Sequence, residues 1–210
     1  MPGVNAFDKS AQQYEAWFAE HPLVYVSELH AVREFIPKNG DGIEIGIGTG
    51  RFAAPLGIRR GVEPSRAMAE LAKKKGLDVV SGVAENLPYK DNELDFALMV
   101  TTVCFLDDID LAFKETHRVL KSGGLFIIGF VDRNSPLGKL YLERKDKSAF
   151  YKDATFYSVH ELVSHLKKAG FDDFSFKQTI FRPLSEIQEA EPVKDGYGEG
   201  SFVVVRGVKK

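Results

Sequence analysis

Cysteine is almost absent from this sequence of 210 residues, which contains Cys104 and no other. A single cysteine excludes a disulfide within the chain and any cysteine-rich metal site, and it suits a reducing, cytoplasmic setting. The five histidines are scattered without the spacing of a metal-binding motif, so we expect no metal.

The sequence also has no large excess of charge of one sign and no long apolar run. Its formal net charge is −2 although 28% of the residues are charged, so composition gives no support for nucleic-acid binding. No apolar run approaches the ~20 residues of a membrane span, and the N-terminus lacks the features of a signal peptide. We therefore expect no nucleic acid and no membrane span, whereas the oligomeric state stays open.

What the sequence does contain is an alternation of strand-like and helix-like segments from residue 40 onward. This alternation predicts a mostly parallel α/β sheet with helices on both faces. Two further strands near the C-terminus should form an antiparallel hairpin at the edge of the sheet, which makes seven strands in all. The expected strands cover 42–47, 58–62, 78–81, 94–100, 124–130, 174–180 and 202–208.

We expect one domain over 1–210, because 44% hydrophobic residues are enough for one full core. Its predicted parts are an N-terminal helical lid (1–36), a ligand-binding core (40–131), a segment on the substrate side (132–157), and a C-terminal helix with the hairpin (158–210). The lid should hold two helices, near 10–18 and 22–35. Ser65 and the pair Ser158 and Glu161 are typical of helix N-termini.

The most informative stretch is 42–50, in which an apolar strand leads into Gly46, Gly48 and Gly50. Glycines let the backbone turn sharply and leave no Cβ between the backbone and a ligand. Glu44 stands just before this turn, where it can order the loop or face a ligand ammonium. Glu63 ends the next predicted strand, where a carboxylate can accept hydrogen bonds from both hydroxyls of a ribose.

This pattern favours a nucleoside joined to an amino acid, and S-adenosylmethionine more than a dinucleotide. Residues 48–53 do fit the looser G-x-G-x-x-A fingerprint of dinucleotide-binding proteins. However, Glu63 follows sooner than the ~20 residues that this fingerprint calls for. An ordinary tight turn followed by a surface glutamate is the remaining alternative.

Several motifs in order resemble the class I S-adenosylmethionine-dependent methyltransferases, in particular the type 11 group related to ubiquinone- and menaquinone-biosynthesis enzymes. The resemblance extends over almost the whole chain, and it implies a Rossmann-like fold and methyl transfer. The matching segments are 44–50 (EIGIGTG), 61–65 (GVEPS), 82–89 (GVAENLPY), 93–97 (ELDFA) and 118–124 (RVLKSGG).

The resemblance also implies roles for individual residues. The three glycines would pack against the methionine part of the cofactor, and Glu63 would hold the ribose hydroxyls. Thr101 would contact the methionine amino group through its carbonyl oxygen. The other cofactor-binding residues that it implies are Pro64 and Ser65 beside the adenine, Ala84 and Glu85 at the adenine edge, and Tyr14 and Trp17 in the lid.

Two departures from the family pattern concern cofactor affinity. Val83 stands where the family often has an acid that accepts a hydrogen bond from the adenine amino group. The stretch from Gly50 to Glu63 is shorter than usual, so its helix should make only about one turn, as Pro55 and Gly57 also indicate.

A sulfonium is already an excellent leaving group, so catalysis depends mainly on positioning the nucleophile and excluding water. The sequence shows no convincing base, and Tyr14, His21 and Cys104 are weak catalytic candidates. We expect the segment 132–157 to form the substrate wall through Tyr141, Phe150 and Tyr151. Because this segment is also rich in Lys and Arg, it suits a planar or anionic small molecule.

The expected function is therefore methyl transfer from S-adenosylmethionine to an O, N or C atom of a small-molecule acceptor, with S-adenosylhomocysteine as the product. A non-catalytic module that binds this cofactor and a nicotinamide-dependent oxidoreductase are the alternatives of a different class. If the acceptor is not a small molecule, the alternative is methylation of a protein or an RNA. The near-neutral net charge of the chain disfavours RNA.

Overall fold

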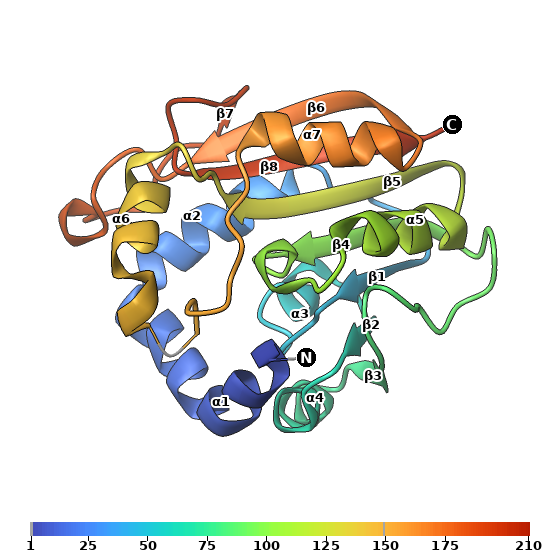
Figure 1. Cartoon of the computed structure of the whole chain (residues 1–210), viewed down its shortest axis with the longest axis horizontal. Helices are drawn as coiled ribbons and strands as arrows, with labels where there is room; N and C mark the ends of the chain where they lie inside the picture. Colours follow the sequence, from blue (N-terminus) through green and yellow to red (C-terminus); the bar gives the residue numbers. More distant parts are fainter. Residues whose placement is uncertain (1, 149) are drawn as a thin grey trace.

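The computed structural model describes residues 2–148 and 150–210, and in this part of the chain eight strands form one sheet (Figure 1). The strand order is β3-β2-β1-β4-β5-β8-β6-β7. Strands β1 to β5 are parallel, whereas β8 pairs antiparallel with both β5 and β6. The bounds are β1 Gly42–Ile45, β2 Arg60–Glu63, β3 Asp78–Ser81, β4 Leu94–Val100, β5 Leu120–Val131, β6 Phe171–Thr179, β7 Lys194–Asp195 and β8 Phe202–Lys209.

The α/β class, the mostly parallel sheet and the antiparallel C-terminal pair are confirmed, and two details differ. The two-residue strand β7 adds an eighth strand beside β6, and β8 lies inside the sheet between β5 and β6. Strand β5 begins at Leu120 rather than near 124, because the chain bulges there instead of turning. Leu94 pairs with Leu120 and Phe96 already pairs with Leu125, so the intervening residues of β5 are accommodated as an irregularity.

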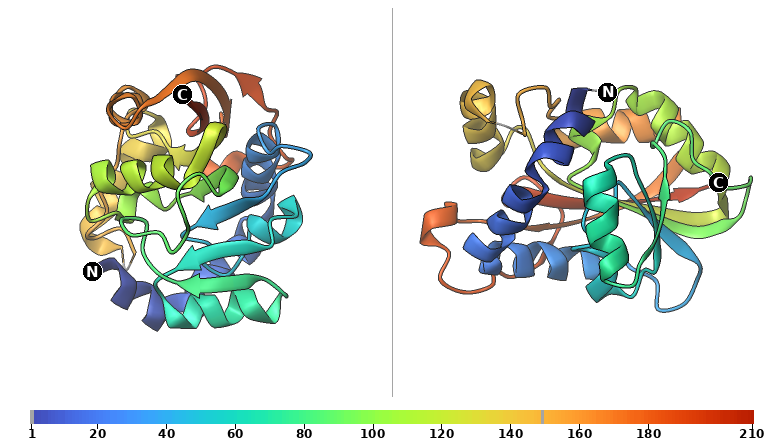
Figure 2. Two further views of the ribbon diagram at one scale, coloured as in Figure 1. Left: turned by 90° about the vertical axis from the view of Figure 1, so that its right-hand side faces the viewer. Right: turned by 90° about the horizontal axis from the view of Figure 1, so that it is seen from below.

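Helices cover both faces of this sheet, as Figure 2 shows from two sides. Helices α5 (Ile109–Val119) and α7 (Val159–Lys168) pack on one face, over a core that contains Phe113 and Phe126. The opposite face carries α2 (Pro22–Arg33), α3 (Ala53–Leu56) and α4 (Arg66–Lys74), over a core that contains Phe96 and Phe202. The four residues of α3 confirm the expectation of a single turn.

The predicted helix starts are present in the structure. The Ser65 hydroxyl accepts a hydrogen bond from the Met68 N–H (3.3 Å), and Asp108 does the same for the Leu111 N–H (3.0 Å). Ser158 and Glu161 form a full capping box, with the Ser158 N–H donating to Glu161 Oε2 at 2.8 Å. These caps explain why α4 and α7 begin where the sequence indicates, and Asp108 caps α5 in the same way.

The N-terminal helix α1 (Pro2–Glu20) is longer than the predicted 10–18. Its first turns carry no cap that local sequence could reveal, but they meet α4 in the folded protein. Asp8 reaches the N-terminus of α4, and Phe7 packs against Phe105 and Phe150. Tertiary contacts therefore extend a helix that propensity alone does not predict.

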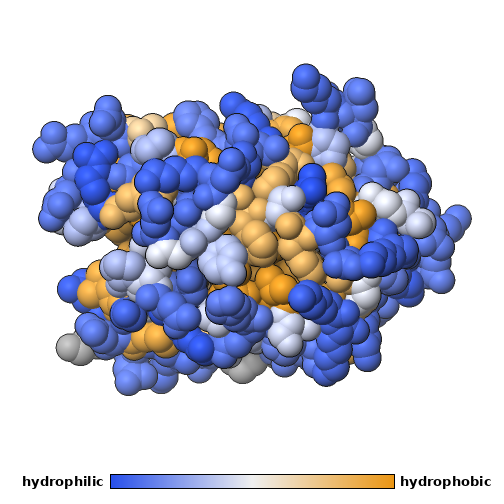
Figure 3. Space-filling model, turned by 90° about the horizontal axis from the view of Figure 1, so that it is seen from above, coloured by the Kyte–Doolittle hydropathy of each residue, from blue (hydrophilic) through white to orange (hydrophobic). Residues whose placement is uncertain are grey.

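The segment after β5 holds α6 (Pro136–Arg144). The described residues also form the short 3-10 turns η1 (Val103–Phe105), η2 (Lys145–Lys147) and η3 (Leu184–Glu186). The surface seen from above has mostly hydrophilic residues around its margin and hydrophobic ones toward its centre (Figure 3). Among the described residues, no helix combines the length and the apolar character that crossing a bilayer requires.

Candidate functional site

A cavity lies at the carboxyl ends of the parallel strands, where β1, β2 and β4 leave the sheet. Ile45 and Gly46 line it from β1, Glu63 from β2, and Val100 and Thr101 from β4. In an open α/β sheet this is the edge at which ligands bind. Four residues of α1 also line the cavity: Phe7, Tyr14, Trp17 and Phe18.

The glycine turn after β1 contributes Gly46 and Gly48 to this cavity, but not Gly50. All three have positive φ angles, of +68°, +55° and +78°, which side chains rarely adopt. A Cβ on Gly46 would lie 2.4 Å from the Thr102 side chain, whereas one on Gly48 would meet only the Tyr14 hydroxyl at 3.8 Å. Gly50 instead faces Leu77, so its role is packing of the turn against α4.

Glu63 is the carboxylate at the centre of the cofactor end of the cavity. Its Oε2 accepts a hydrogen bond from the Gly48 N–H (2.8 Å) and its Oε1 accepts one from the Ser65 N–H (2.9 Å). Burial raises the pKa of this carboxyl to about 7, against the lowering effect of those two N–H groups. Each oxygen keeps acceptor capacity for a ligand hydroxyl.

Glu44 and Ser65 were candidate cofactor contacts, and the structure places neither among the residues that line the cavity. Glu44 is buried, and its carboxylate accepts a hydrogen bond from the Ala53 backbone at the start of α3. Of its two predicted roles, ordering the loop is therefore the one that the geometry supports. The Ser65 hydroxyl caps α4 and donates to Asp8 Oδ1 at 2.6 Å, so it faces α1 rather than the cavity.

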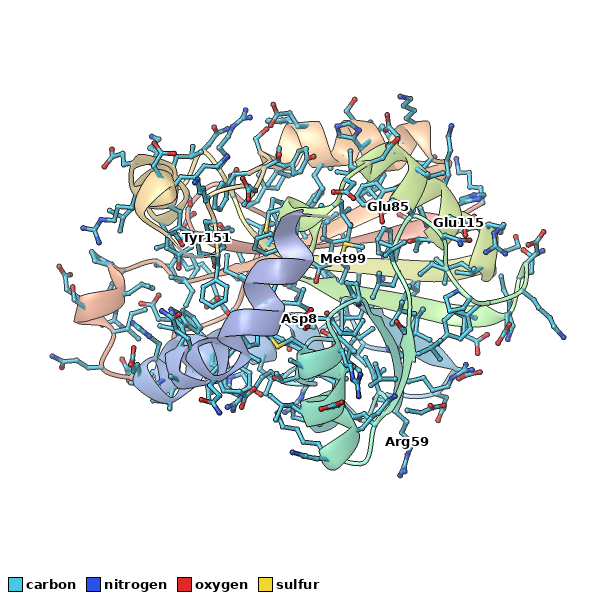
Figure 4. All side chains as sticks on the ribbon, turned by 60° about the horizontal axis from the view of Figure 1, so that its bottom comes forward. Asp8, Arg59, Glu85, Met99, Glu115 and Tyr151 are labelled. Atoms are coloured by element: carbon cyan, nitrogen blue, oxygen red, sulfur yellow. The ribbon has the colours of Figure 1, made fainter. Side chains whose placement is uncertain are left out.

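The segment after β3 lines the cavity with Gly82, Val83, Ala84 and Glu85. The Glu85 carboxylate accepts hydrogen bonds from the N–H groups of Asp107 (2.9 Å) and Asp108 (3.3 Å), on the side of the cavity next to α5 (Figure 4). Glu85 thus fastens the loop before α5 to the loop after β3. The Val83 side chain offers no acceptor where the family often has an acid.

Thr101 lies directly after β4 and has a φ angle of +49°. A β-branched residue rarely adopts this conformation, and such strain tends to occur at functional sites. Its N–H donates to the Gly129 carbonyl (2.8 Å), and its own carbonyl oxygen accepts from the Cys104 thiol (3.3 Å). The backbone of Thr101 is therefore held at the cavity by contacts on both sides.

Two of the three weak catalytic candidates do not line the cavity. The His21 ring stacks on Trp17 at 4.9 Å, and its Nδ1 lies 3.1 Å from the Trp17 carbonyl oxygen. The Cys104 thiol donates a hydrogen bond to the Thr101 carbonyl oxygen, and burial raises the pKa of this thiol to about 12. Tyr14 does line the cavity, but burial and the charges of Glu44 and Glu63 raise the pKa of its hydroxyl, which disfavours it as a base.

We expect the Cys104 thiol to resist alkylation in the folded protein. With a pKa of about 12, roughly one thiol in ten thousand is ionised at pH 8, and the thiolate is the reactive form. Mass spectrometry after incubation with iodoacetamide measures this directly, with protein unfolded in guanidinium chloride as the control. Equal rates in the two samples would contradict the raised pKa of the thiol.

The predicted substrate residues Tyr141, Phe150 and Tyr151 all line the cavity, and we call the part that they line its aromatic end. The Tyr141 and Tyr151 rings stack with centroids 5.1 Å apart, and Tyr151 also stacks on Phe105 at 5.9 Å. Figure 4 shows Tyr151 between α6 and α1. Among the described residues that line the cavity none is Lys, Arg or His, so the basic side chains of 132–157 give no support for an anionic ligand.

Sequence reasoning missed Glu28, which lines the same cavity from α2 and is only 5% exposed. Burial alone raises the pKa of its carboxyl to about 8, and no hydrogen bond or charged neighbour contributes to this shift. A signal for it was present in the helical pattern. Position 28 falls on the stripe formed by the buried Val24, Ala31 and Val32, and a carboxylate on such a stripe is rare without a partner.

Two carboxylates hold α1 over the cavity. Glu15 contacts Arg51 and the Thr49 hydroxyl in the glycine turn, with a further ion pair to Lys75 at 3.6 Å. Asp8 accepts from Ser65 on the far side of the cavity, where it faces α4 (Figure 4). The helix that carries Tyr14 and Trp17 is thus fastened to the two loops that flank Glu63.

Known proteins resemble this chain in both sequence and fold. Residues 43–128 match the family model described as a methyltransferase domain. One solved structure is that of an S-adenosylmethionine-dependent methyltransferase of Thermotoga maritima, described as a possible histamine N-methyltransferase. Its sequence is 55% identical to that of this chain. That structure superimposes with a TM-score of 0.96, and the match covers 98% of this chain and 99% of that one.

Two curated relatives complete the comparison. An uncharacterized protein of Methanocaldococcus jannaschii is 47% identical over 98% of this chain and 100% of its own length. The demethylmenaquinone methyltransferase of Staphylococcus aureus is 25% identical, over 65% of this chain and 69% of its own length.

Proposed function

Because this chain belongs to the class I S-adenosylmethionine-dependent methyltransferases, we propose that it methylates an O, N or C nucleophile of a small molecule. The observation that carries the proposal is the buried carboxylate of Glu63, held at the carboxyl end of β2 by the N–H groups of Gly48 and Ser65. It stands where a ribose must lie if the methionine part of the cofactor follows the glycine turn.

The residues of the cavity fit the cofactor. Gly48 leaves open space that a side chain would narrow, and Glu63 keeps acceptor capacity for two hydroxyls. We assign the glycine turn and the Thr101 carbonyl to the methionine part, and Glu63 to the ribose. The residues assigned to the adenine are Pro64, Ala84 and Glu85, with Val83 as an apolar wall in place of an acid.

We further assign Tyr14 and Trp17 to a lid that closes over the reacting groups. Both line the cavity from α1, and Tyr14 lies between Gly48 of the glycine turn and the ring of Phe7. When bound, the cofactor supplies a methyl group on a positively charged sulfur. The aromatic faces of the lid stabilise positive charge by roughly 0.5–2 kcal/mol and exclude water from the transfer.

The acceptor lies at the aromatic end, against Tyr141, Phe150 and Tyr151. Residues of α1 line the cavity together with Tyr141 of α6 and with Phe150 and Tyr151, and this enclosure by aromatic side chains favours a small molecule over a protein or RNA segment. The description of the Thermotoga maritima relative as a possible histamine N-methyltransferase also favours a small acceptor.

Calorimetric titration with S-adenosylmethionine, S-adenosylhomocysteine and NAD, in parallel, tests the proposal. We expect micromolar binding of the first two and none of NAD. Binding of NAD alone would favour an oxidoreductase. Binding of the methyl donor without methyl transfer to any acceptor of a broad panel would favour a non-catalytic module.

A further inference from the structure

We propose that the methyl acceptor is an amine, and that its ammonium group binds the Glu28 carboxylate at the aromatic end of the cavity. This inference rests on the proposed methyltransferase function and names the class of its substrate. Three observations lead to it: Glu28 is a buried carboxylate with no partner among the described residues, it lines a cavity together with aromatic rings, and the described residues of that lining include no cation.

Glu28 combines a largely buried side chain with a place in the lining of the cavity and no hydrogen-bond partner among the described residues. It is 5% exposed, and its carboxyl receives no hydrogen bond and no ion pair from the described residues. By contrast, Glu63 in the same cavity accepts from two backbone N–H groups. An unpaired buried carboxyl destabilises a fold, so its retention in a cavity points to a ligand that supplies the missing partner.

The surroundings of Glu28 place it with the acceptor rather than with the cofactor. It lines the same cavity as Tyr14, Tyr141 and Tyr151, and its charge raises the pKa of each of these hydroxyls. The Glu63 charge raises the pKa of Tyr14 but does not contribute to the raised pKa of Tyr141. Tyr14 therefore feels the charge of both Glu63 and Glu28. We place Glu63 at the cofactor end of the cavity and Glu28 at the aromatic end.

The charge of the cavity selects for a cation. Its described lining contains the acids Glu28, Glu63 and Glu85 and no basic side chain. Aromatic faces attract an ammonium group, and a buried carboxylate attracts it far more than a neutral or anionic group. A carboxylate or phosphate on the acceptor would find no basic side chain among the described lining residues.

The same carboxylate prepares the nitrogen for transfer. A protonated amine has no free electron pair, so one proton must pass from the ammonium to Glu28 before the reaction. The neutral nitrogen then forms a bond to the methyl carbon as the carbon–sulfur bond breaks, and that electron pair stays on sulfur. The product leaves as a methylated ammonium, and Glu28 releases its proton to solvent, so one proton is produced in each turnover.

Calorimetry on protein saturated with S-adenosylhomocysteine tests the inference without turnover. The probes are benzylamine, 2-phenylethylamine, tyramine and histamine, each measured against the compound with a hydroxyl in place of the amino group. We expect at least one amine to bind tenfold or more tightly than its matched alcohol. We expect the variant Glu28→Gln to abolish this preference while binding S-adenosylhomocysteine as the wild type does.

The matched control is Glu34→Gln, which makes the same change at the end of α2, where Glu34 pairs with Lys177 on the surface. This variant should keep the amine preference. Equal binding of amines and alcohols to the wild type, no amine binding at all, or a preference that survives in Glu28→Gln would each overturn the inference. Failure to bind S-adenosylhomocysteine would instead overturn the proposed function, so the two failures are distinguishable.

Discussion

Glu28→Gln should raise the free energy of unfolding by about 2–4 kcal/mol at pH 8 and change it little near pH 4. The pKa of the Glu28 carboxyl is about 8 in the folded protein, against an ordinary value of 4.5. Below pH 4.5 the carboxyl is protonated in both states. As the pH rises from 4.5 to 8, the unfolded chain loses this proton readily and the folded chain does not, so stability falls across that range.

Urea unfolding of both proteins between pH 4 and pH 8.5 measures this effect. The difference between the two stability curves should open from about pH 4.5 and become largest near pH 8. The wild type and the variant will share a remaining slope, because burial also raises the pKa of Glu63 to about 7 and that of Glu44. Parallel curves for the two proteins would show that Glu28 is not buried as the structure indicates, and Glu34→Gln supplies the surface control.

Glu63→Ala should weaken binding of S-adenosylhomocysteine by roughly tenfold to a hundredfold, which corresponds to about 1–3 kcal/mol. The substitution removes the acceptor that we assign to the ribose hydroxyls. It also leaves the N–H groups of Gly48 and Ser65 without their present partner, so the glycine turn loses a constraint. Calorimetry with S-adenosylhomocysteine measures the loss, and unchanged affinity would remove Glu63 from the site.

A matched control separates cofactor binding from loop support. Glu115 also accepts a backbone hydrogen bond, from the Leu87 N–H at 3.0 Å, and it pairs with Arg118 outside the cavity. Glu115→Ala should therefore lower stability and leave the affinity for S-adenosylhomocysteine within about twofold of the wild type. If both variants lost affinity equally, the effect of Glu63→Ala would be structural rather than due to contact with the ligand.

The parts of the site that could be predicted from sequence are those that depend on local backbone geometry. A glycine turn after an apolar strand must lie at the ligand edge of a parallel sheet, and Gly46, Gly48 and Glu63 are found there. The gathering of Tyr141 and Tyr151 at one end of the cavity followed from the same rule, because their segment leaves the sheet at that edge.

Other features depend on which way a side chain points, and this is decided by packing. Glu44 and Gly50 stand within the predicted motif, yet they face the protein interior, because α3 and α4 pack against that side of the turn. Glu28 was missed for the opposite reason. A helix with a buried stripe reveals which residues are inside the protein, but only the folded chain shows that position 28 borders a cavity instead of the core.

The position of β8 between β5 and β6 has a consequence for how the protein is made. During translation β5 and then β6 leave the ribosome well before β8, which pairs with both of them. Until then, β5 and β6 present unpaired edges that can join other chains. The nascent chain therefore cannot complete its sheet by folding in order of synthesis, and such distant pairing is slow. We expect delayed release or truncation before β8 to favour aggregation over a stable partial fold.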